Sequence, residues 1–470
     1  MTSWLPGTLE GTGPLYLRLA DRIENDIDAG RLAPGEKLPP QRNLAFDIGV
    51  TIGTVGRAYA LLHERGLVSG EVGRGTYILE RNGPTPAGPI AAPVGIGTRP
   101  IQAPDGLLRM DSTAATDVGQ SGAIETYLAA ITRDHPHEIA NYTRTLPDHW
   151  LAAGADWLAA PGWRPAESGI VPTLGGHPGI LAAITAITNP GERILIEEVS
   201  YASVARSASL AGRRITTVAL DGQGIIPDDL ERVCAREHPR MLFLMPGIQN
   251  PTLAVMPEDR RRAVVEIARR YDLWLIEDVI FGSLVEDRIP GLAELAPERT
   301  FRVGGMSKSV AAGIRGGWIS CPPGYTARVH AAHKLLTGGM PFLLAELAAR
   351  LVLDGEADRI RQAVREEIAA REAMARQILD GFEFASHPHC PFMWIAVPEP
   401  WQSGTLKKAA ENDGILIDDE DEFKSGRTER ACHRIRVGFT VPGERDAVVR
   451  GFTTLRELMR GGNAVYDSYS

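Results

Sequence analysis

Residues 302–318 read RVGGMSKSVAAGIRGGW. Within this run Lys308 lies among small residues, just after a short apolar segment at 300–303, and Arg315 follows seven positions later. Small neighbours let a bulky ligand approach the backbone, and a desolvated lysine can lose its proton and attack a carbonyl group. An arginine at a fixed distance suits a phosphate on the same ligand, because its planar fork binds two oxygens at once. Alone the pattern is weak evidence, since most Ser-Lys pairs are surface residues.

The sequence before this run alternates apolar segments with helical patterns. Buried strands are expected at 193–196, 241–244 and 273–276, and helices are expected at 180–188 and 258–271. Buried strands that alternate with helices predict an α/β domain with a mainly parallel sheet. In such domains ligands bind where the strands end.

The expected strand ends carry groups that suit pyridoxal phosphate, which needs a lysine for its aldehyde and an anchor for its phosphate. Gly175 and Gly176 precede a helix, so their backbone N–H groups can hold phosphate at its positive end. Asp278 can pair with the pyridine nitrogen, Asn250 can donate to the ring oxygen, and Tyr201 can stack on the ring. Each group alone also has an ordinary structural interpretation. Their common order along the chain is the argument.

Composition limits the class of protein. At 470 residues the chain is expected to contain two or three domains. Its net charge of -9 argues against a protein that coats nucleic acid in general, so any DNA binding must be local. Four scattered cysteines offer no disulfide framework, and no run approaches the ~18 apolar residues of a membrane span. No signal peptide is expected either, and together these features predict a cytoplasmic protein.

The first 80 residues follow a different pattern. Helices are expected at 14–30, 41–48 and 51–65, after a loose arm at 4–13. Two short helices joined by a tight turn containing glycine are typical of a helix-turn-helix, whose second helix enters the major groove of DNA. Two short strands within 67–79 are expected to form a wing with a basic tip. Any bundle of three small helices could produce the same helical pattern.

An ordered set of short motifs strengthens this interpretation. The set comprises LPPQR (38–42), LA (44–45), TV (54–55), RAY (57–59), LL (61–62), GLV (66–68) and GRGTY (73–77). Together these motifs resemble the winged helix of the GntR family of bacterial repressors and activators. The resemblance implies binding of double-stranded DNA through the second helix, the wing and the arginine after the proline pair. The corresponding positions are Arg42, Thr51, Thr54, Arg57 and Arg74.

Residues 110–460 resemble the fold-type I, aspartate-aminotransferase-like family. The resemblance implies that Lys308 forms the internal aldimine and that Arg315 binds the phosphate. It also implies that Arg436, in the motif RIRVGF, receives a substrate carboxylate. Further cofactor contacts are implied at Asp278, Asn250, Tyr201, Gly175, Gly176, His177, Phe281 and Ser307. A winged helix fused to this domain resembles the MocR subfamily, for which a homodimer is expected.

Three positions depart from the family pattern. Phe281 stands where a tyrosine hydroxyl usually bonds the cofactor's ring oxygen, and Gly305 stands in place of a phosphate-binding serine. Leu253 replaces a glycine in the turn after Asn250. Loss of a donor to the ring oxygen should raise the pKa of the aldimine and weaken cofactor binding. Effector sensing is therefore expected rather than efficient transamination.

We expect a winged helix at 1–80, a linker rich in Pro, Gly and Ala at 81–107, and an aminotransferase-like domain at 108–470. The last of these should have a large α/β part and a small C-terminal α+β part. The acidic run at 418–422 is expected to be a solvated face. No metal is expected, because the scattered His and Cys residues lack the spacing of a zinc site.

The leading hypothesis is a pyridoxal phosphate-dependent transcription regulator. It would sense a small amine or amino acid, or pyridoxal phosphate itself, through an aldimine at Lys308. An active aminotransferase with a vestigial winged helix is the main alternative. A cofactor-free binding protein on the same scaffold is a further alternative.

Overall fold

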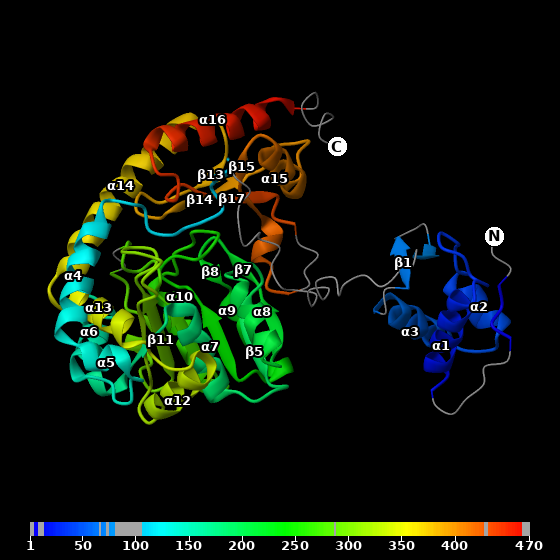
Figure 1. The fold of residues 1–470 in the computed structure, drawn as a ribbon, viewed down its shortest axis with the longest axis horizontal. Helices are drawn as coiled ribbons and strands as arrows, with labels where there is room; N and C mark the ends of the chain where they lie inside the picture. Colours follow the sequence, from blue (N-terminus) through cyan, green and yellow to red (C-terminus); the bar gives the residue numbers. More distant parts are fainter. Residues whose placement is uncertain are drawn as a thin grey trace. The chain divides into compact units, whose positions relative to one another are not determined.

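The computed structural model describes residues 4–7, 14–64, 67–71, 75–79, 106–285, 288–426 and 431–462. The chain divides into two compact units, residues 1–94 and 95–470 (Figure 1). Within the described residues, no helix combines the length and the apolarity that a bilayer crossing demands.

The first unit contains the expected helices and the two wing strands. Its elements are α1 (Leu15–Asp28), α2 (Gln41–Asp47), α3 (Ile52–Glu64), β1 (Val68–Glu71) and β2 (Gly75–Ile78). The two strands are antiparallel, with Val68 opposite Ile78. The Oγ1 of Thr51 accepts a hydrogen bond from the backbone N–H of Thr54 at 3.3 Å, so Thr51 caps α3. The core draws on every one of these elements and includes Leu19, Ile23, Leu44, Val55, Leu62 and Ile78.

A buried carboxylate on α1 ties the N-terminal arm to this unit. Asp26 is 1% exposed, and it accepts hydrogen bonds from Trp4 Nε1 at 2.8 Å and Arg31 Nε at 2.9 Å. Arg22 also pairs with it, at 3.1 Å. The expectation of a loose arm is therefore wrong at Trp4, because the indole N–H finds a buried acceptor on the helix.

A seven-stranded sheet organises the second unit, in the order β4-β12-β11-β10-β9-β5-β6. The strands are β4 (Ile170–Thr173), β12 (Gly317–Ser320), β11 (Thr300–Gly305), β10 (Trp274–Asp278), β9 (Met241–Leu244), β5 (Arg193–Glu197) and β6 (Arg214–Val218). β12 is antiparallel to both of its neighbours, and the pairs from β11 to β6 are parallel. The expected parallel α/β sheet is confirmed.

Helices cover both faces of this sheet, because alternate residues of its buried strands point in opposite directions. Leu195, Leu242 and Leu275 belong to one core cluster, whereas Ile194 and Phe243 belong to the other. The first cluster packs against α9 (Pro227–Glu237), α10 (Glu258–Arg270) and α11 (Leu292–Leu295). The second packs against α6 (Asp148–Trp157), α7 (Gly176–Ile187), α8 (Ser203–Leu210) and α12 (Thr326–Thr337). The result is a three-layer arrangement, with the sheet between two layers of helices.

A smaller part follows the sheet domain, as expected. Its antiparallel sheet has the order β13-β14-β17-β16, from β13 (Phe384–Ala385), β14 (Phe392–Ala396), β17 (Arg434–Gly438) and β16 (Asp418–Asp419). Its helices are α14 (Glu356–Ile378), α15 (Ser403–Asn412) and α16 (Arg445–Arg460). A parallel pair of β3 (Leu108–Arg109) and β15 (Ile415–Leu416) joins the start of the unit to this part. The remaining α-helices and strands are α4 (Gln120–Asp134), α5 (Pro136–Ala140), α13 (Phe342–Leu353), β7 (Leu220–Asp221) and β8 (Gly224–Ile225).

Candidate functional site

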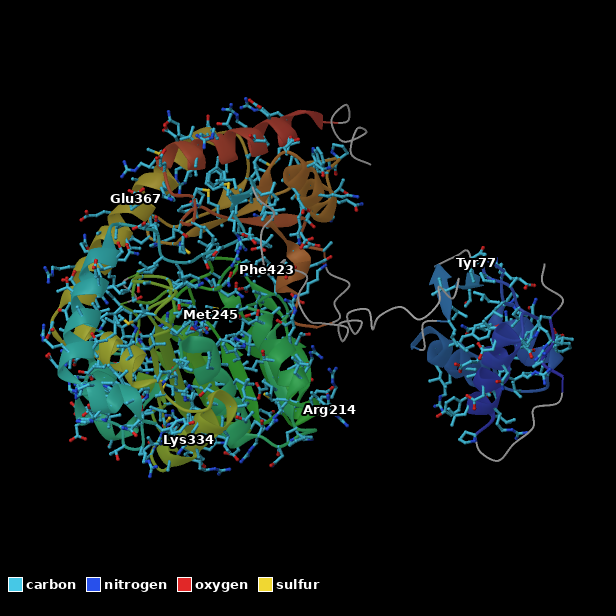
Figure 2. All side chains as sticks on the ribbon, in the orientation of Figure 1. Tyr77, Arg214, Met245, Lys334, Glu367 and Phe423 are labelled. Atoms are coloured by element: carbon cyan, nitrogen blue, oxygen red, sulfur yellow. The ribbon has the colours of Figure 1, made fainter. Side chains whose placement is uncertain are left out.

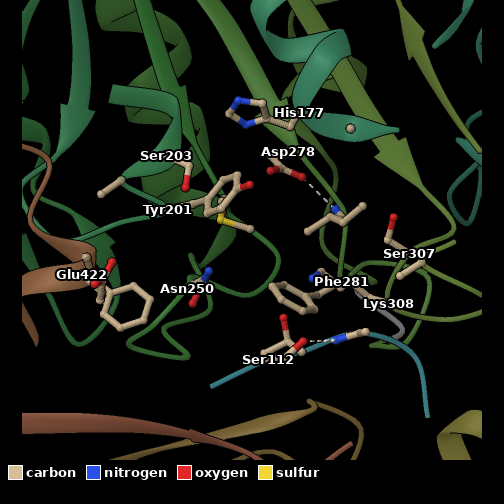
Figure 3. Close-up of a pocket in the computed structure, with 18 of the residues that line it drawn as sticks. Ser112, His177, Tyr201, Ser203, Asn250, Asp278, Phe281, Ser307, Lys308 and Glu422 are labelled. Carbon is tan, nitrogen blue, oxygen red and sulfur yellow. Dashed lines mark hydrogen bonds between the residues drawn. The ribbon is translucent and has the colours of Figure 1, made fainter. Parts of the chain in front are cut away.

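A cavity of about 520 Å³ opens at the carboxyl ends of the parallel strands (Figure 3). Met245 and Phe423, both labelled in Figure 2, belong to its wall. Ten of the residues expected from the sequence also line it: Gly176, His177, Tyr201, Asn250, Asp278, Phe281, Ser307, Lys308, Arg315 and Arg436. Gly175 lies just behind, where a Cβ would be 3.8 Å from the Arg315 guanidinium. The fold thus brings together residues that are far apart in the sequence.

Asp278 is the buried acid of this cavity. It ends β10, is 5% exposed, and its Oδ1 accepts the backbone N–H of Ile280 at 2.9 Å. Burial raises the pKa of this carboxyl to about 7, and the hydrogen bond and the charge of Lys308 oppose the shift only in part. A cationic N–H donor on a ligand would therefore be a favourable partner for Asp278.

Lys308 is half-buried, in the turn that leaves β11. Two backbone hydrogen bonds fix the turn immediately before the lysine. The N–H of Met306 donates to the carbonyl of Gly316 at 3.0 Å, and the carbonyl of Ser307 accepts the N–H of Ala115 at 2.9 Å. The backbone that carries the amine is thus held from two directions.

Glycines shape the end of the cavity near Arg315. Gly175 has a φ of +90°, and a Cβ on Gly317 would lie 2.7 Å from the Gly175 Cα, so two backbones approach each other closely. Arg315 itself has a φ of +53° and an exposed side chain. Gly176 is the first residue of α7, so the positive end of a helix faces the same place. These features together make a cradle for an anion.

His177 belongs to the same end of the cavity. Its Nε2 lies 2.9 Å from the Oγ of Ser207, whereas its Nδ1 is buried without a hydrogen-bond partner among the described residues. Burial, and to a smaller extent the charge of Arg315, lower the pKa of His177. Its ring packs edge-on against Tyr201, with 5.7 Å between centroids. An unpaired buried nitrogen here is consistent with a ligand that completes the site.

Gly305, which departs from the family pattern, has little room for a side chain. A Cβ at this position would lie 3.1 Å from the carbonyl oxygen of Gly316, 3.2 Å from Ile280 Cδ1 and 3.3 Å from the Gly176 nitrogen. A serine would crowd the glycine-built cradle. The glycine at this position is therefore consistent with the tight local packing.

Asn250 has a fixed amide orientation. Its Oδ1 accepts a hydrogen bond from Arg436 Nη1 at 2.9 Å, so its Nδ2 is left as the donor on the other side (Figure 3). The preceding Gln249 donates to Glu197 Oε2 at 3.1 Å and to the carbonyl of Val199 at 2.6 Å. Leu253 in the same turn has a φ of +61°, which explains why glycine is the usual residue there.

The acidic run at 418–422 is not a solvated face. Asp418, Glu420 and Glu422 are only 1%, 6% and 7% exposed, because Arg436, Lys424 and Arg206 respectively pair with them. The expectation was wrong because it ignored cross-strand partners. A strand alternation over this run would have placed Asp418 on one face and Asp419 on the other.

The candidate DNA-binding residues lie in the first unit. Thr51, Thr54 and Arg57 line one shallow hollow at the start of α3. Arg42 is exposed on α2. Arg74 lies outside the described residues. Contact of these residues with DNA stays a prediction.

Two family models cover most of the chain. Residues 124–445 match that of aminotransferase class I and II, and residues 15–78 match that of bacterial regulatory proteins of the gntR family. The chain belongs to the aminotransferase class I and II family. Its N-terminal unit is a gntR-family winged helix, fused to the aminotransferase domain.

Several relatives share this fusion or only its second part. The uncharacterized HTH-type transcriptional regulator YdeF of Bacillus subtilis is 26% identical, over 97% of each chain. The HTH-type transcriptional regulator TauR of Rhodobacter capsulatus is 25% identical, over 96% of this chain and 97% of its own. The 2-aminoadipate transaminase of Thermus thermophilus is 26% identical, over 65% of this chain and 78% of its own. The crystal structure of LysN, an alpha-aminoadipate aminotransferase from Thermus thermophilus, covers 76% of this chain and 93% of its own with a TM-score of 0.68 at 23% identity.

The fold and the aminotransferase relatives imply pyridoxal phosphate as the cofactor. The residues present fit it. The glycine cradle with Arg315 suits the phosphate, and the buried Asp278 suits the cationic ring nitrogen. Asn250 presents a donor, and Lys308 presents the amine. Phe281 offers no hydroxyl, and its ring instead packs against Phe392. The role of each residue toward the cofactor stays a prediction.

Proposed function

We propose that this protein is a transcription regulator that binds double-stranded operator DNA and senses a small amine through pyridoxal phosphate. The observation that carries the proposal is the fusion itself. A gntR-family winged helix shares one chain with a cavity that contains Lys308, Asp278 and Asn250. Two full-length relatives are named as HTH-type transcriptional regulators, which supports the same function.

In this proposal Arg42 and Arg74 contact phosphates, and the start of α3 reads base edges through Thr51, Thr54 and Arg57. Operators with two-fold symmetry require two winged helices, so the protein acts as a homodimer. Such a regulator works in the bacterial cytoplasm, on the nucleoid.

The cavity supplies the sensing function. When bound, pyridoxal phosphate would supply an aldehyde that condenses with a primary amine and releases water. Lys308 would be its first partner, and a small amine or amino acid would then take the place of Lys308 and free the lysine amine. The effector changes DNA binding only if it binds two arrangements of the protein with different affinity. Alternatively, pyridoxal phosphate is itself the signal, and its loss or gain changes the operator affinity.

The first experiment is the visible absorption spectrum of the purified protein with added pyridoxal phosphate, beside Lys308→Ala. The wild type is expected to show an absorption band of the lysine-bound cofactor, and the variant is expected to lack this band. A mobility shift on the DNA that flanks the protein's own gene then tests the first unit, with Arg42→Ala as control. If wild type and Arg42→Ala shift this DNA equally, Arg42 does not contribute to DNA binding and the assignment is wrong.

A second function is supported by the same cavity. Lys308, Asp278 and Asn250 all line it, and aminotransferases are among the relatives, so turnover is the alternative. An assay with an amino donor and a keto acid distinguishes the two functions. Many turnovers at rates of about 1 per second or more would favour an enzyme over a sensor.

A further inference from the structure

The arginine expected to receive a carboxylate already has one. Asp418 on β16 lies directly opposite Arg436 on β17. Its Oδ2 accepts hydrogen bonds from Arg436 Nη2 at 2.6 Å and Nε at 3.2 Å. The two residues are 1% and 3% exposed, so this is a buried ion pair. Separating such a pair without a replacement is costly, because it leaves a charge unpaired in the interior.

The other contacts of the guanidinium are also protein groups. Nη1 donates to Asn250 Oδ1 at 2.9 Å, and Nη2 donates a second hydrogen bond to the carbonyl of Asp111 at 3.3 Å. The rings of Phe392 and Phe423 lie 5.3 Å and 4.7 Å from its central carbon. A ligand carboxylate grips a guanidinium with two oxygens on neighbouring N–H groups. Here the edge formed by Nε and Nη2 is occupied by Asp418, and the second Nη2 proton faces the Asp111 carbonyl.

Charge adds to this geometric obstacle. A carboxylate brought to Arg436 would be a second anion beside Asp418, at a position with little water to screen them. Glu422 lines the same cavity, where Arg206 pairs with it at 3.4 Å and Lys407 at 3.7 Å. Arg206 and Lys407 thus already have a carboxylate partner.

We propose that Asp418 sets the chemical class of the effector by occupying Arg436, so that the cavity accepts a primary amine without a carboxylate and disfavours an amino acid. This inference rests on the proposed sensing function and narrows it. Apolar residues of the wall, among them Met245, Ile280 and Phe281, suit the neutral remainder of such an amine.

The test compares two ligands of the same size that differ in one charge, L-alanine and L-alaninamide. Each is titrated into the protein loaded with pyridoxal phosphate, and the change in visible absorption gives the half-saturating concentration. Asp418→Asn is expected to lower that concentration at least tenfold for alanine and less than threefold for alaninamide. For each ligand, the half-saturating concentration of the variant is divided by that of wild type, so the different basicities of the two amines cancel. Equal changes for both ligands, or no change, would overturn the proposal.

A double variant shows whether the gain needs the released arginine. In Asp418→Asn with Arg436→Gln, no unpaired charge remains, and the gain for alanine should disappear. A gain that persists in the double variant contradicts the proposed role of Arg436. If the single variant fails to fold, the wild type must still prefer alaninamide over alanine at least tenfold after correction for the fraction of free amine.

Propionate gives a readout that does not depend on the cofactor. It has a carboxylate but no amine, and calorimetry on the cofactor-free protein should detect binding to Asp418→Asn but not to wild type. Binding to wild type of equal strength would overturn the inference. Absence of any absorption band with pyridoxal phosphate would instead contradict the proposed function, while the propionate result would still decide the role of Asp418.

Discussion

The ring of Phe281 packs edge-on against the ring of Phe392, with 5.5 Å between centroids and 63° between planes. Phe392 in turn lies under the guanidinium of Arg436. The position that usually carries a cofactor-binding hydroxyl is therefore part of an aromatic contact that extends through Phe392 to Arg436. Phe281 has no hydroxyl to bond, and its ring is instead buried, with only 2% of the residue exposed.

Phe281→Tyr tests what the missing hydroxyl does. A donor to the ring oxygen favours the deprotonated link between Lys308 and the cofactor, so the pKa of that link should fall. A hydrogen bond to a charged oxygen predicts a decrease of roughly 1 to 2 units. A pH titration of the absorption band measures it, and Phe281→Leu, which adds no donor, should leave the pKa unchanged. An unchanged pKa in the tyrosine variant would show that the hydroxyl does not reach the ring oxygen.

Asp278→Asn should change how stability depends on pH. Burial raises the pKa of Asp278 from 3.8 to about 7, so the folded protein holds a proton between those values that the unfolded chain has lost. That stabilising contribution is complete below about pH 4 and is lost as the pH rises through 7. In cofactor-free protein, thermal melts should therefore show a smaller decrease in Tm from pH 4 to pH 8 for the variant than for wild type. Glu197, whose pKa burial also raises to about 7, should maintain part of the decrease in both proteins.

The same substitution should weaken cofactor binding. The neutral amide cannot offer the charge-assisted hydrogen bond that a cationic ring nitrogen prefers, so affinity should fall by roughly 10- to 100-fold. Titration with pyridoxal phosphate, followed by absorption, measures the loss. If the affinity for pyridoxal phosphate and the pH dependence of Tm are both unchanged in the variant, Asp278 does not bind the ring nitrogen.

Gly305→Ser restores the serine of the family but should not restore a phosphate contact. Its Cβ would crowd the carbonyl of Gly316 and the nitrogen of Gly176, so the free energy of unfolding should fall by about 1 to 3 kcal/mol. Gly313→Ser is the control, because a Cβ there meets nothing within 4 Å and the change should be within about 0.5 kcal/mol. Denaturant melts measure both. Tighter cofactor binding by Gly305→Ser without a loss of stability would contradict this account.

Asp26→Asn tests the anchor of the N-terminal arm. Burial alone would raise the pKa of Asp26, but hydrogen bonds from Arg31, Trp4 and Arg22 outweigh it and hold the pKa below the ordinary 3.8. The stabilisation is present above that value and is lost as the pH falls below it. The variant should lose about 1 to 3 kcal/mol at neutral pH. Hydrogen exchange of α1 in the full chain localises the effect, and Asp47→Asn, on an exposed side chain, should leave the exchange unchanged.

The sequence was sufficient for those parts of the site that follow directly from strand ends. Asp278 was predictable because an acid at the end of an apolar segment lies at the ligand edge of a parallel sheet. Asp418 was not, because its burial depends on Arg436 on the neighbouring strand of another sheet, and an acidic run by itself is usually solvated. The tight packing at Gly305 could not be predicted for a similar reason, because the atoms that crowd a Cβ there come from other segments of the chain.

The hydrogen bond from Arg436 to Asn250 crosses from the small sheet to a loop of the large one, between residues 186 positions apart. Asn250 is therefore in contact with both parts of the second unit, since it lies on a loop of the large sheet and is bonded to the small sheet. A ligand bound to the amide nitrogen of Asn250 would stabilise the amide orientation in which Oδ1 accepts the hydrogen bond from Arg436. A contact that stabilises β17, which carries Arg436, would stabilise the same amide orientation. If Asn250 binds the cofactor ring, reciprocity requires that the affinity for that ring and the placement of the small sheet share one coupling free energy, of the same size in either direction.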